Sequence, residues 1–145
     1  LHTSWKGRFT VINKKPLFIV DGAHNAGAAD KMAESVRHYF NGKKLIYIMG
    51  VFADKEYKIV LEKTAHFAEK IYTIETPDNP RALPAEELAK AARVYNSSAE
   101  STKSIKDAVE KAFSCAGDDE NSVILAFGSL SFIGALTNAV EEYVG

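Results

Sequence analysis

The nine residues Leu17-Phe18-Ile19-Val20-Asp21-Gly22-Ala23-His24-Asn25 join a continuous apolar run to a polar loop that contains a glycine. A short apolar run that is rich in β-branched and aromatic residues and ends at a glycine-containing loop is typical of a strand buried on both faces. Such strands belong to parallel sheets that are covered by helices. This stretch therefore predicts an α/β fold.

The same pattern returns further along the chain. The other apolar runs, which end at or near glycine or proline, are 45–49, 71–74 and 123–127. Between the runs, apolar residues recur about every 3.6 positions, which predicts helices over 29–40, 59–67, 88–95, 105–113 and 133–140. Residues suited to helix starts precede three of them, namely Pro84, Ser104 and either Ser129 or Ser131. Strands and helices therefore alternate, as in a Rossmann-like α/β fold.

An additional strand is predicted at 9–12, ahead of the first core strand. The link 13–16 is too short for a parallel crossover, so the two strands should form an antiparallel hairpin. A poorly patterned stretch at 97–99 is a candidate for a fifth strand. We expect a single domain over 1–145 with a mostly parallel sheet, one antiparallel edge strand and helices on both faces.

The composition excludes several classes of function. The chain has 18 basic and 19 acidic residues and a formal net charge of -1, so neither nucleic acid nor a membrane is expected as a partner. One cysteine excludes an internal disulfide framework, and no Cys/His cluster has zinc-site spacing. No apolar run is long enough for a transmembrane helix, and the first residues lack the apolar stretch of a signal peptide. We expect a soluble cytoplasmic domain and, because residue 1 is not Met, a fragment of a longer chain.

The loops that leave the predicted strands carry more functional groups than those that enter them. The leaving loops contain glycines, acids, basic groups, a hydroxyl and a histidine; they are 21–25, 50–55, 76–81 and 128–130. In a parallel sheet these loops meet at one edge, which is where open α/β sheets bind ligands. We therefore expect Asp21, His24 and Ser129 to lie along a shared edge.

Two interpretations of the first loop remain open on spacing alone. A carboxylate at Asp21 can accept hydrogen bonds from vicinal hydroxyls, as on a ribose, and Gly22 removes a Cβ that would block close approach. Alternatively, Asp21 and Asn25 only cap the following helix. His24 is the only histidine in a leaving loop; a solvated or capping role is common for such a residue, and its neighbours favour a functional one.

The other candidate residues have equally open roles. Ser129 either caps the last helix or binds a carboxylate. Asp54, Lys55 and Arg81 are either solvated charges, the commoner outcome, or part of a site. Neither a G-x-x-x-x-G-K-[ST] nor a G-x-G-x-x-G loop occurs, so the chain alone is not expected to hydrolyse ATP.

Five short blocks occur in a fixed order over nearly the whole chain: Trp5-Lys6-Gly7-Arg8-Phe9, Asp21-Gly22-Ala23-His24-Asn25, Asp54-Lys55, Arg81-Ala82 and Gly128-Ser129-Leu130. Together they resemble the C-terminal domain of folylpolyglutamate synthase/dihydrofolate synthase, within the Mur ligase superfamily. The resemblance implies a Rossmann-like domain with about six strands that closes over ATP. An upstream domain, absent from this chain, would carry the phosphate-binding loop and the Mg²⁺ ligands.

The resemblance also implies a reaction and residue roles. Members join L-glutamate to folate by ATP-dependent amide ligation through an acyl phosphate. Arg8 and Asp21 would bind ATP, at its phosphates and its ribose respectively. His24 would be the catalytic residue and, with Ser129, would bind the incoming glutamate. No metal ligand is expected in this chain, and the isolated domain is expected to be inactive.

Three alternatives stay open. One is the C-terminal domain of a peptidoglycan-precursor (Mur) ligase, although Gly22 and the block 128–130 favour the folate branch. The second is a non-catalytic nucleotide-binding module, and the third is a Rossmann-like domain with capped helices that binds no ligand. A phosphate-binding loop encoded upstream would favour a ligase over that module.

Overall fold

The computed structural model describes residues 3–6 and 8–145, so Gly7 of the first block and the residues before Thr3 lie outside the described residues. The strands are β1 (Thr3–Trp5), β2 (Phe9–Asn13), β3 (Leu17–Val20), β4 (Lys44–Gly50), β5 (Lys70–Thr73), β6 (Glu100–Ser101) and β7 (Ser122–Gly128). The α-helices are α1 (Ala26–Tyr39), α2 (Tyr57–Thr64), α3 (Ala85–Arg93), α4 (Ile105–Ala116) and α5 (Ile133–Val144). Two short 3-10 helices are η1 (Ala65–Phe67) and η2 (Leu130–Phe132).

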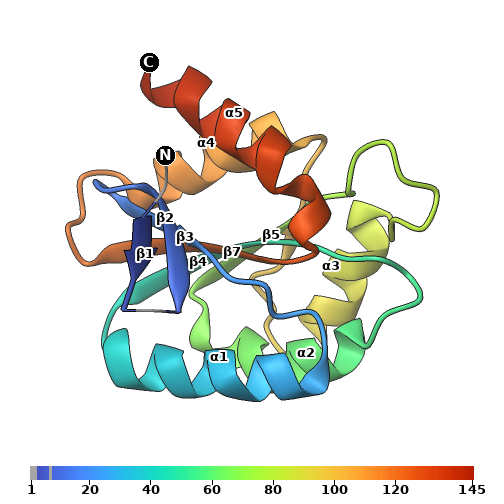
Figure 1. Ribbon diagram of the computed structural model, residues 1–145. Coiled ribbons are helices and arrows are strands. Elements are labelled where there is room, and N and C mark those ends of the chain that lie inside the picture. Colours follow the sequence, from blue (N-terminus) through green and yellow to red (C-terminus); the bar gives the residue numbers. More distant parts are fainter. Residues whose placement is uncertain (1–2, 7) are drawn as a thin grey trace.

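All the strands belong to one sheet with the order β1-β2-β3-β7-β4-β5-β6 (Figure 1). In this order, every neighbouring pair from β3 through β7, β4 and β5 to β6 is parallel. β7 lies in the centre of the sheet, between β3 and β4. β2 pairs antiparallel with β3 through the predicted hairpin. The mostly parallel α/β fold is therefore confirmed.

The sheet differs from the prediction at its two edges. It has seven strands instead of about six, and β1 adds a second antiparallel strand. Trp5 of β1 stacks on Phe40 with ring centroids 5.0 Å apart. The sequence of a segment of three residues does not predict such a tertiary contact. The strand expected at 97–99 is a turn, because the Asn96 side chain accepts the Ser98 N–H and the chain becomes extended only at β6.

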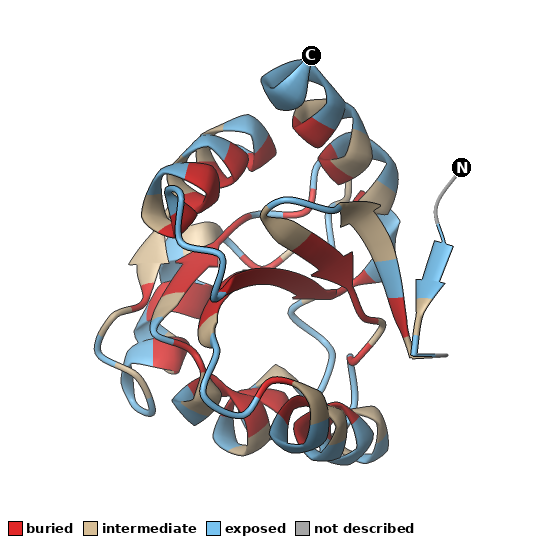
Figure 2. Ribbon diagram, turned by 90° about the vertical axis from the view of Figure 1, so that its left-hand side faces the viewer, coloured by how far each residue is buried: buried red, intermediate tan, exposed pale blue. Residues whose placement is uncertain are grey.

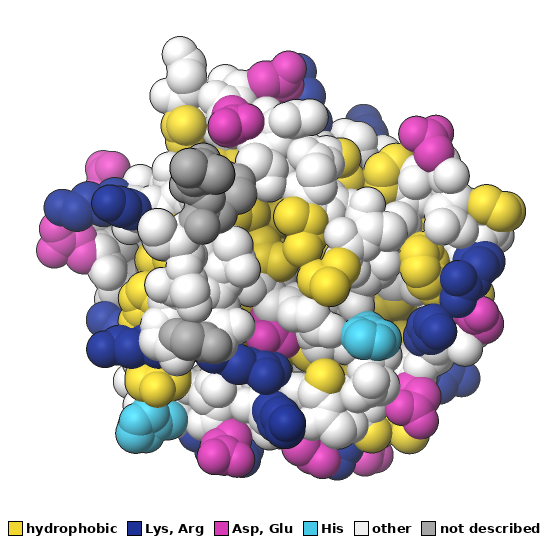
Figure 3. Space-filling model, viewed as in Figure 1, with side chains coloured by type: hydrophobic (Ala, Val, Ile, Leu, Met, Phe, Trp, Pro, Cys, Tyr) yellow, Lys and Arg dark blue, Asp and Glu magenta, His cyan; other side chains and the backbone are white. Residues whose placement is uncertain are grey.

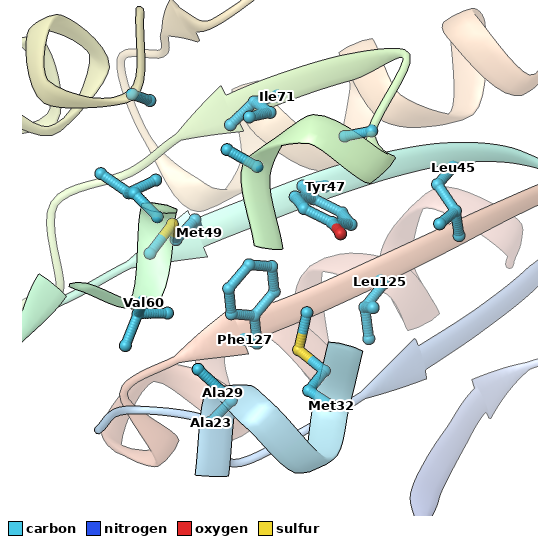
Figure 4. Close-up of a cluster of buried hydrophobic side chains, with 14 of the residues drawn as sticks. Ala23, Ala29, Met32, Leu45, Tyr47, Met49, Val60, Ile71, Leu125 and Phe127 are labelled. Atoms are coloured by element: carbon cyan, nitrogen blue, oxygen red, sulfur yellow. The ribbon is translucent and has the colours of Figure 1, made fainter. Parts of the chain in front are cut away.

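Helices cover both faces of the sheet, as predicted (Figures 1 and 2). α1, α2 and α3 pack on one face, while α4 and α5 pack on the other. On the first face, Tyr47 and Phe127 of the central strands lie near Met32 of α1 (Figure 4). Successive residues of β4 and β7 point to opposite faces, so both strands are buried on two sides, which explains their continuous apolar sequences.

The helix starts follow the sequence signals in most cases. Asn25 caps α1 by accepting the Ala28 N–H, Ser104 caps α4, and Pro84 directly precedes α3. Ser129 caps the short helix η2 and not α5, because its hydroxyl accepts the Ser131 N–H. The last helix, α5, begins at Ile133 as the periodicity predicted, but without the expected serine cap.

Candidate ligand site at the carboxyl ends of the strands

A cavity of about 320 Å³ lies at the edge where the parallel strands end. Its lining comes from the loops after β3, β4, β5 and β7 and from α2, and consists of Ala23, His24, Val51, Phe52, Lys55, Tyr57, Val60, Arg81, Gly128, Ser129, Leu130 and Ser131. The structure thus brings His24 and Ser129 together. Asp21 starts the first of these loops but does not line the cavity.

The loop after β7 is hydrogen-bonded to the end of β4. The Ser129 N–H donates to the Gly50 carbonyl oxygen at 2.8 Å. Gly128 has φ +118°, and a Cβ at this position would lie 2.1 Å from that same oxygen. Only glycine tolerates this backbone conformation and this close approach. Gly128 therefore allows Ser129 to reach the cavity.

His24 is held by a hydrogen bond within its own loop. Its Nδ1 lies 2.8 Å from the Gly22 carbonyl oxygen. A carbonyl oxygen can only accept, so Nδ1 carries the proton, and Nε2 of the neutral ring keeps a lone pair. The side chain is exposed and borders the cavity. His24 thus offers a proton acceptor at the cavity edge.

Asp21 pairs with Arg8. Its Oδ2 accepts the Ala23 N–H at 2.8 Å and Nη2 of Arg8 at 3.2 Å. Nε of Arg8 lies 2.9 Å from Oδ1, as an ion pair without hydrogen-bond geometry. Arg8 also donates to the Ala28 carbonyl oxygen in α1. The side chain of Asp21 is 3% exposed and that of Arg8 is 24% exposed, so the two expected nucleotide ligands lie together with Asp21 shielded from solvent.

Burial and pairing act in opposite directions on the pKa of Asp21. Removal from water, the larger influence, raises this pKa above its ordinary value of 3.8, whereas the Arg8 charge and the Ala23 N–H lower it. The charged form of Asp21 therefore depends on its partner, because an uncompensated buried charge is strongly unfavourable.

The loop after β7 contributes hydroxyls and an apolar side chain. The Oγ atoms of Ser129 and Ser131 lie 2.7 Å apart, and Ser129 Oγ accepts the Ser131 N–H. Ser129 therefore caps a helix and lines the cavity at the same time. A Cβ at Gly22 would lie 3.4 Å from the side chain of Leu130. Gly22 and Leu130 are therefore neighbours, and a Cβ at position 22 would stand in ordinary van der Waals contact with Leu130.

Three further side chains line the cavity wall, namely Phe52, Lys55 and Arg81. Lys55 and Arg81 are exposed to solvent, as expected, and also border the cavity. Nη2 of Arg81 donates to both carboxylate oxygens of Asp54, at 2.9 and 3.1 Å. The available signal was position: each of these residues follows a core strand.

The start of α1 is already hydrogen-bonded. The Ala26 N–H donates to Glu56 Oε1 at 3.1 Å, and the Ala28 N–H donates to Asn25 Oδ1 at 2.9 Å. An anion at this helix end would have to displace these groups.

Charge is dispersed over the surface. On the face in Figure 3, basic and acidic side chains lie mostly toward the periphery, and hydrophobic atoms gather nearer the centre. Within residues 3–6 and 8–145, no three or more His, Cys, Asp or Glu side chains are grouped to hold a metal ion. In the same described part of the chain, no helix combines the length and the apolar character needed to cross a membrane.

Most of the chain matches a known family of domains. Residues 7–130 match the model of the Mur ligase, glutamate ligase domain. The chain belongs to this family. The resemblance drawn from the five sequence blocks is therefore confirmed at the level of the family.

The relatives that this chain resembles are enzymes of the folate branch. The dihydrofolate synthase/folylpolyglutamate synthase of Bacillus subtilis is 28% identical over 138 residues, covering 95% of this chain and 31% of that protein. The structure of Mycobacterium tuberculosis folylpolyglutamate synthase complexed with ADP and AMPPCP has a TM-score of 0.78 at 24% identity, covering 99% of this chain and 33% of that one. The structure of E. coli FolC in complex with DHPP and ADP has a TM-score of 0.81 at 20% identity. The match covers 97% of this chain and 32% of the FolC chain. Both solved structures share the fold, and the chain spans about a third of the length of these relatives.

Proposed function

We propose that the chain is the C-terminal domain of an ATP-dependent ligase that joins L-glutamate to folate. The observation that carries the proposal is the shared cavity of His24 and Ser129 in a domain of the glutamate ligase family. Since the folate-ligase relatives are about three times as long, we assign the ATPase domain to the same polypeptide. We place the whole protein in the cytoplasm.

The cavity suits an amino acid with two carboxylates. Lys55 puts a cationic side chain on its wall, and Ser129 and Ser131 add hydroxyl groups. Cationic groups and hydroxyls are the natural partners of carboxylates. We therefore propose that L-glutamate binds here, with Ser129 among its ligands.

His24 is proposed as the catalytic residue. The amino group of glutamate must lose a proton as the amide forms. In the neutral ring, donation from Nδ1 to the Gly22 carbonyl oxygen leaves the lone pair on Nε2. His24 can therefore accept that proton as a general base.

Arg8 and Asp21 are proposed to hold the nucleotide. ATP, when bound, supplies the phosphoryl group that activates the folate carboxylate. The partly exposed guanidinium of Arg8 suits phosphate oxygens. Asp21 fits a ribose only after its shielded carboxylate becomes accessible, because Arg8 and the Ala23 N–H now bind it. We assign the phosphate-binding loop and the Mg²⁺ ligands to the rest of the polypeptide.

The folate branch is preferred to the peptidoglycan branch because the named relatives are folate ligases. A ligation assay tests this choice and the proposed division of labour. The whole protein, given ATP, Mg²⁺, L-glutamate and a reduced folate or dihydropteroate, should form the γ-glutamyl amide and release ADP and phosphate. The isolated 145-residue chain should form neither product. No amide from the whole protein, or appreciable turnover by the isolated chain, would contradict the proposal.

A further inference from the structure

Arg8 covers both oxygens of the Asp21 carboxylate. The Asp21 N–H donates to the Ala126 carbonyl oxygen at 2.9 Å, which fixes the residue at the end of β3. Nε of Arg8 lies 2.9 Å from Oδ1 of Asp21, and Nη2 of Arg8 donates to Oδ2 at 3.2 Å. The Ala23 N–H donates to Oδ2 as well, at 2.8 Å. Because the Asp21 side chain is 3% exposed, a ligand reaches its oxygens only when Arg8 moves away.

A ribose would need the same two oxygens. Its vicinal hydroxyls can each donate one hydrogen bond to one oxygen of a carboxylate. The Arg8 guanidinium already approaches the carboxylate at these two points, with Nε at Oδ1 and Nη2 at Oδ2. The Ala23 N–H does not add to the conflict, because a carboxylate oxygen accepts more than one hydrogen bond. Arg8 and a ribose therefore compete for Asp21.

Arg8 itself is held by long and incomplete contacts. Its Nη2 donates to Asp21 and to the Ala28 carbonyl oxygen, each at 3.2 Å, whereas charge-assisted N–H donors to carboxylates typically reach about 2.7–2.9 Å. Its Nε is shielded from solvent, and no acceptor among residues 3–6 and 8–145 meets it with hydrogen-bond geometry. The Arg8 side chain as a whole is 24% exposed. Phosphate oxygens, which bind a guanidinium at two points, would therefore satisfy Arg8 better than its present partners.

We propose, on the basis of the proposed function, that Arg8 makes ribose binding by Asp21 conditional on the phosphates of the nucleotide. Arg8 leaves Asp21 for the phosphate oxygens, and the freed carboxylate then accepts the ribose hydroxyls. A nucleoside offers Arg8 no new acceptor, and neutral hydroxyls are poor substitutes for a cation beside a buried carboxylate. Arg8 is thus a specificity-determining residue that favours nucleotides over nucleosides.

This role couples the two ends of the ligand. Phosphate contacts at Arg8 open the carboxylate that the ribose needs, so the contributions of the two contacts to binding are not additive. With independent contacts, loss of Arg8 would weaken nucleotides and leave nucleosides unaffected. With the coupling, the same loss weakens nucleotides and strengthens nucleosides.

Equilibrium binding of ADP and of adenosine to the whole protein tests this role. Arg8→Lys keeps a cation, but one ammonium group cannot cover both Asp21 oxygens as the guanidinium does. In this variant ADP should bind about tenfold more weakly, because a charge-assisted contact is lost. Adenosine should bind several-fold more tightly than it binds the unaltered protein. Arg8→Met should shift both affinities in the same directions, and if it does not fold, Arg8→Lys alone decides.

A second nucleoside and a matched variant serve as controls. 2′-Deoxyadenosine lacks one of the two hydroxyls, so it should gain much less than adenosine in the Arg8 variants. Arg37→Lys makes the same substitution at an exposed arginine of α1 and should leave the affinities for ADP and adenosine unchanged.

Two outcomes overturn the role of Arg8. In the first, the affinity for adenosine does not rise in the folded Arg8 variants, so Arg8 does not restrict the ribose site. In the second, 2′-deoxyadenosine gains as much as adenosine, so the gain does not involve the vicinal hydroxyls. Because binding is measured without turnover, opposite shifts for ADP and adenosine support the role even if no amide forms and the proposed function has failed. Normal amide formation without these shifts rejects the role and leaves the proposed function intact.

Discussion

Two arginine–aspartate pairs, both joined to loops that leave the parallel strands, differ mainly in burial. Asp21 is 3% exposed, and its partner Arg8 is anchored to α1 as well. Asp54 and Arg81 are both about half exposed. Water screens the second pair and hardly reaches the first. The same chemistry therefore stands in two different surroundings, one shielded from water and one in contact with it.

The pKa values of the two aspartates show the same contrast. Burial raises the pKa of Asp21 despite the nearby Arg8 cation. The hydrogen bond from Arg81 is the main cause that lowers the pKa of Asp54. Opposite charges in contact therefore do not guarantee a stabilised carboxylate, because the loss of water decides the balance.

Arg8→Met should give the largest effect of the comparison. It leaves the Asp21 carboxylate buried without its cation, and removing one partner of a buried pair costs about 3–5 kcal/mol. Urea unfolding of the 145-residue chain at neutral pH measures this loss. The double variant Arg8→Met/Asp21→Asn, which removes the charge as well, should recover most of it. A loss as small as that of a surface charge would show that the pair is not effectively buried.

The loss in Arg8→Met should depend on pH. The raised pKa of Asp21 means that the folded protein favours the protonated form, so this contribution to stability is present at low pH and is lost as pH rises through the folded pKa. Without Arg8 the pKa rises further, and the deficit should shrink as pH falls from neutral toward the ordinary value of 3.8. Urea unfolding of both proteins over this range checks it. A constant or growing deficit at low pH is the opposite result.

Asp21→Ala should have an intermediate effect, on nucleotide binding. In the whole protein we expect the apparent KM for ATP to rise about tenfold while the protein stays folded, since one charge-assisted hydrogen bond is lost. Steady-state kinetics with ATP varied provides the measurement, with the glutamate KM as the internal control. Normal ATP kinetics would remove the ribose assignment and leave Asp21 as the partner of Arg8 alone.

Arg81→Ala should have the smallest effect on stability. Its ion pair is exposed, and such pairs add little to the free energy of unfolding. Thermal unfolding of the 145-residue chain should therefore show no measurable shift. A loss of stability comparable to that of Arg8→Met would mean that the two ion pairs contribute equally to the free energy of unfolding.

The sequence predicted the centre of the fold better than its edges. Continuous apolar runs identify β3, β4 and β7 because strands buried on both faces admit little else. β1 and β6 are too short to show a pattern, and tertiary contacts such as the stacking of Trp5 decide that they are strands.

The candidate site was predictable to the extent that strand direction determines it. His24 and Ser129 meet because both follow parallel strands that end at the same edge. The shielding of Asp21 was not predictable, because it depends on Arg8 reaching it from the turn between β1 and β2. The position of the Arg81 side chain depends on its contacts with Phe52 and Asp54 in another loop. The pattern of charges along the sequence does not predict these contacts.

Replacement of His24 by alanine tests most directly the claim that glutamate is joined at this edge. The His24 side chain is exposed, and its hydrogen bond lies within its own loop. His24→Ala in the whole protein should therefore lower the ligation rate about 10²–10⁴-fold with an unchanged melting temperature. His38→Ala, an exposed histidine of α1, should leave both quantities unchanged. A normal ligation rate in His24→Ala, or a loss that only follows melting of the domain, would contradict the claim.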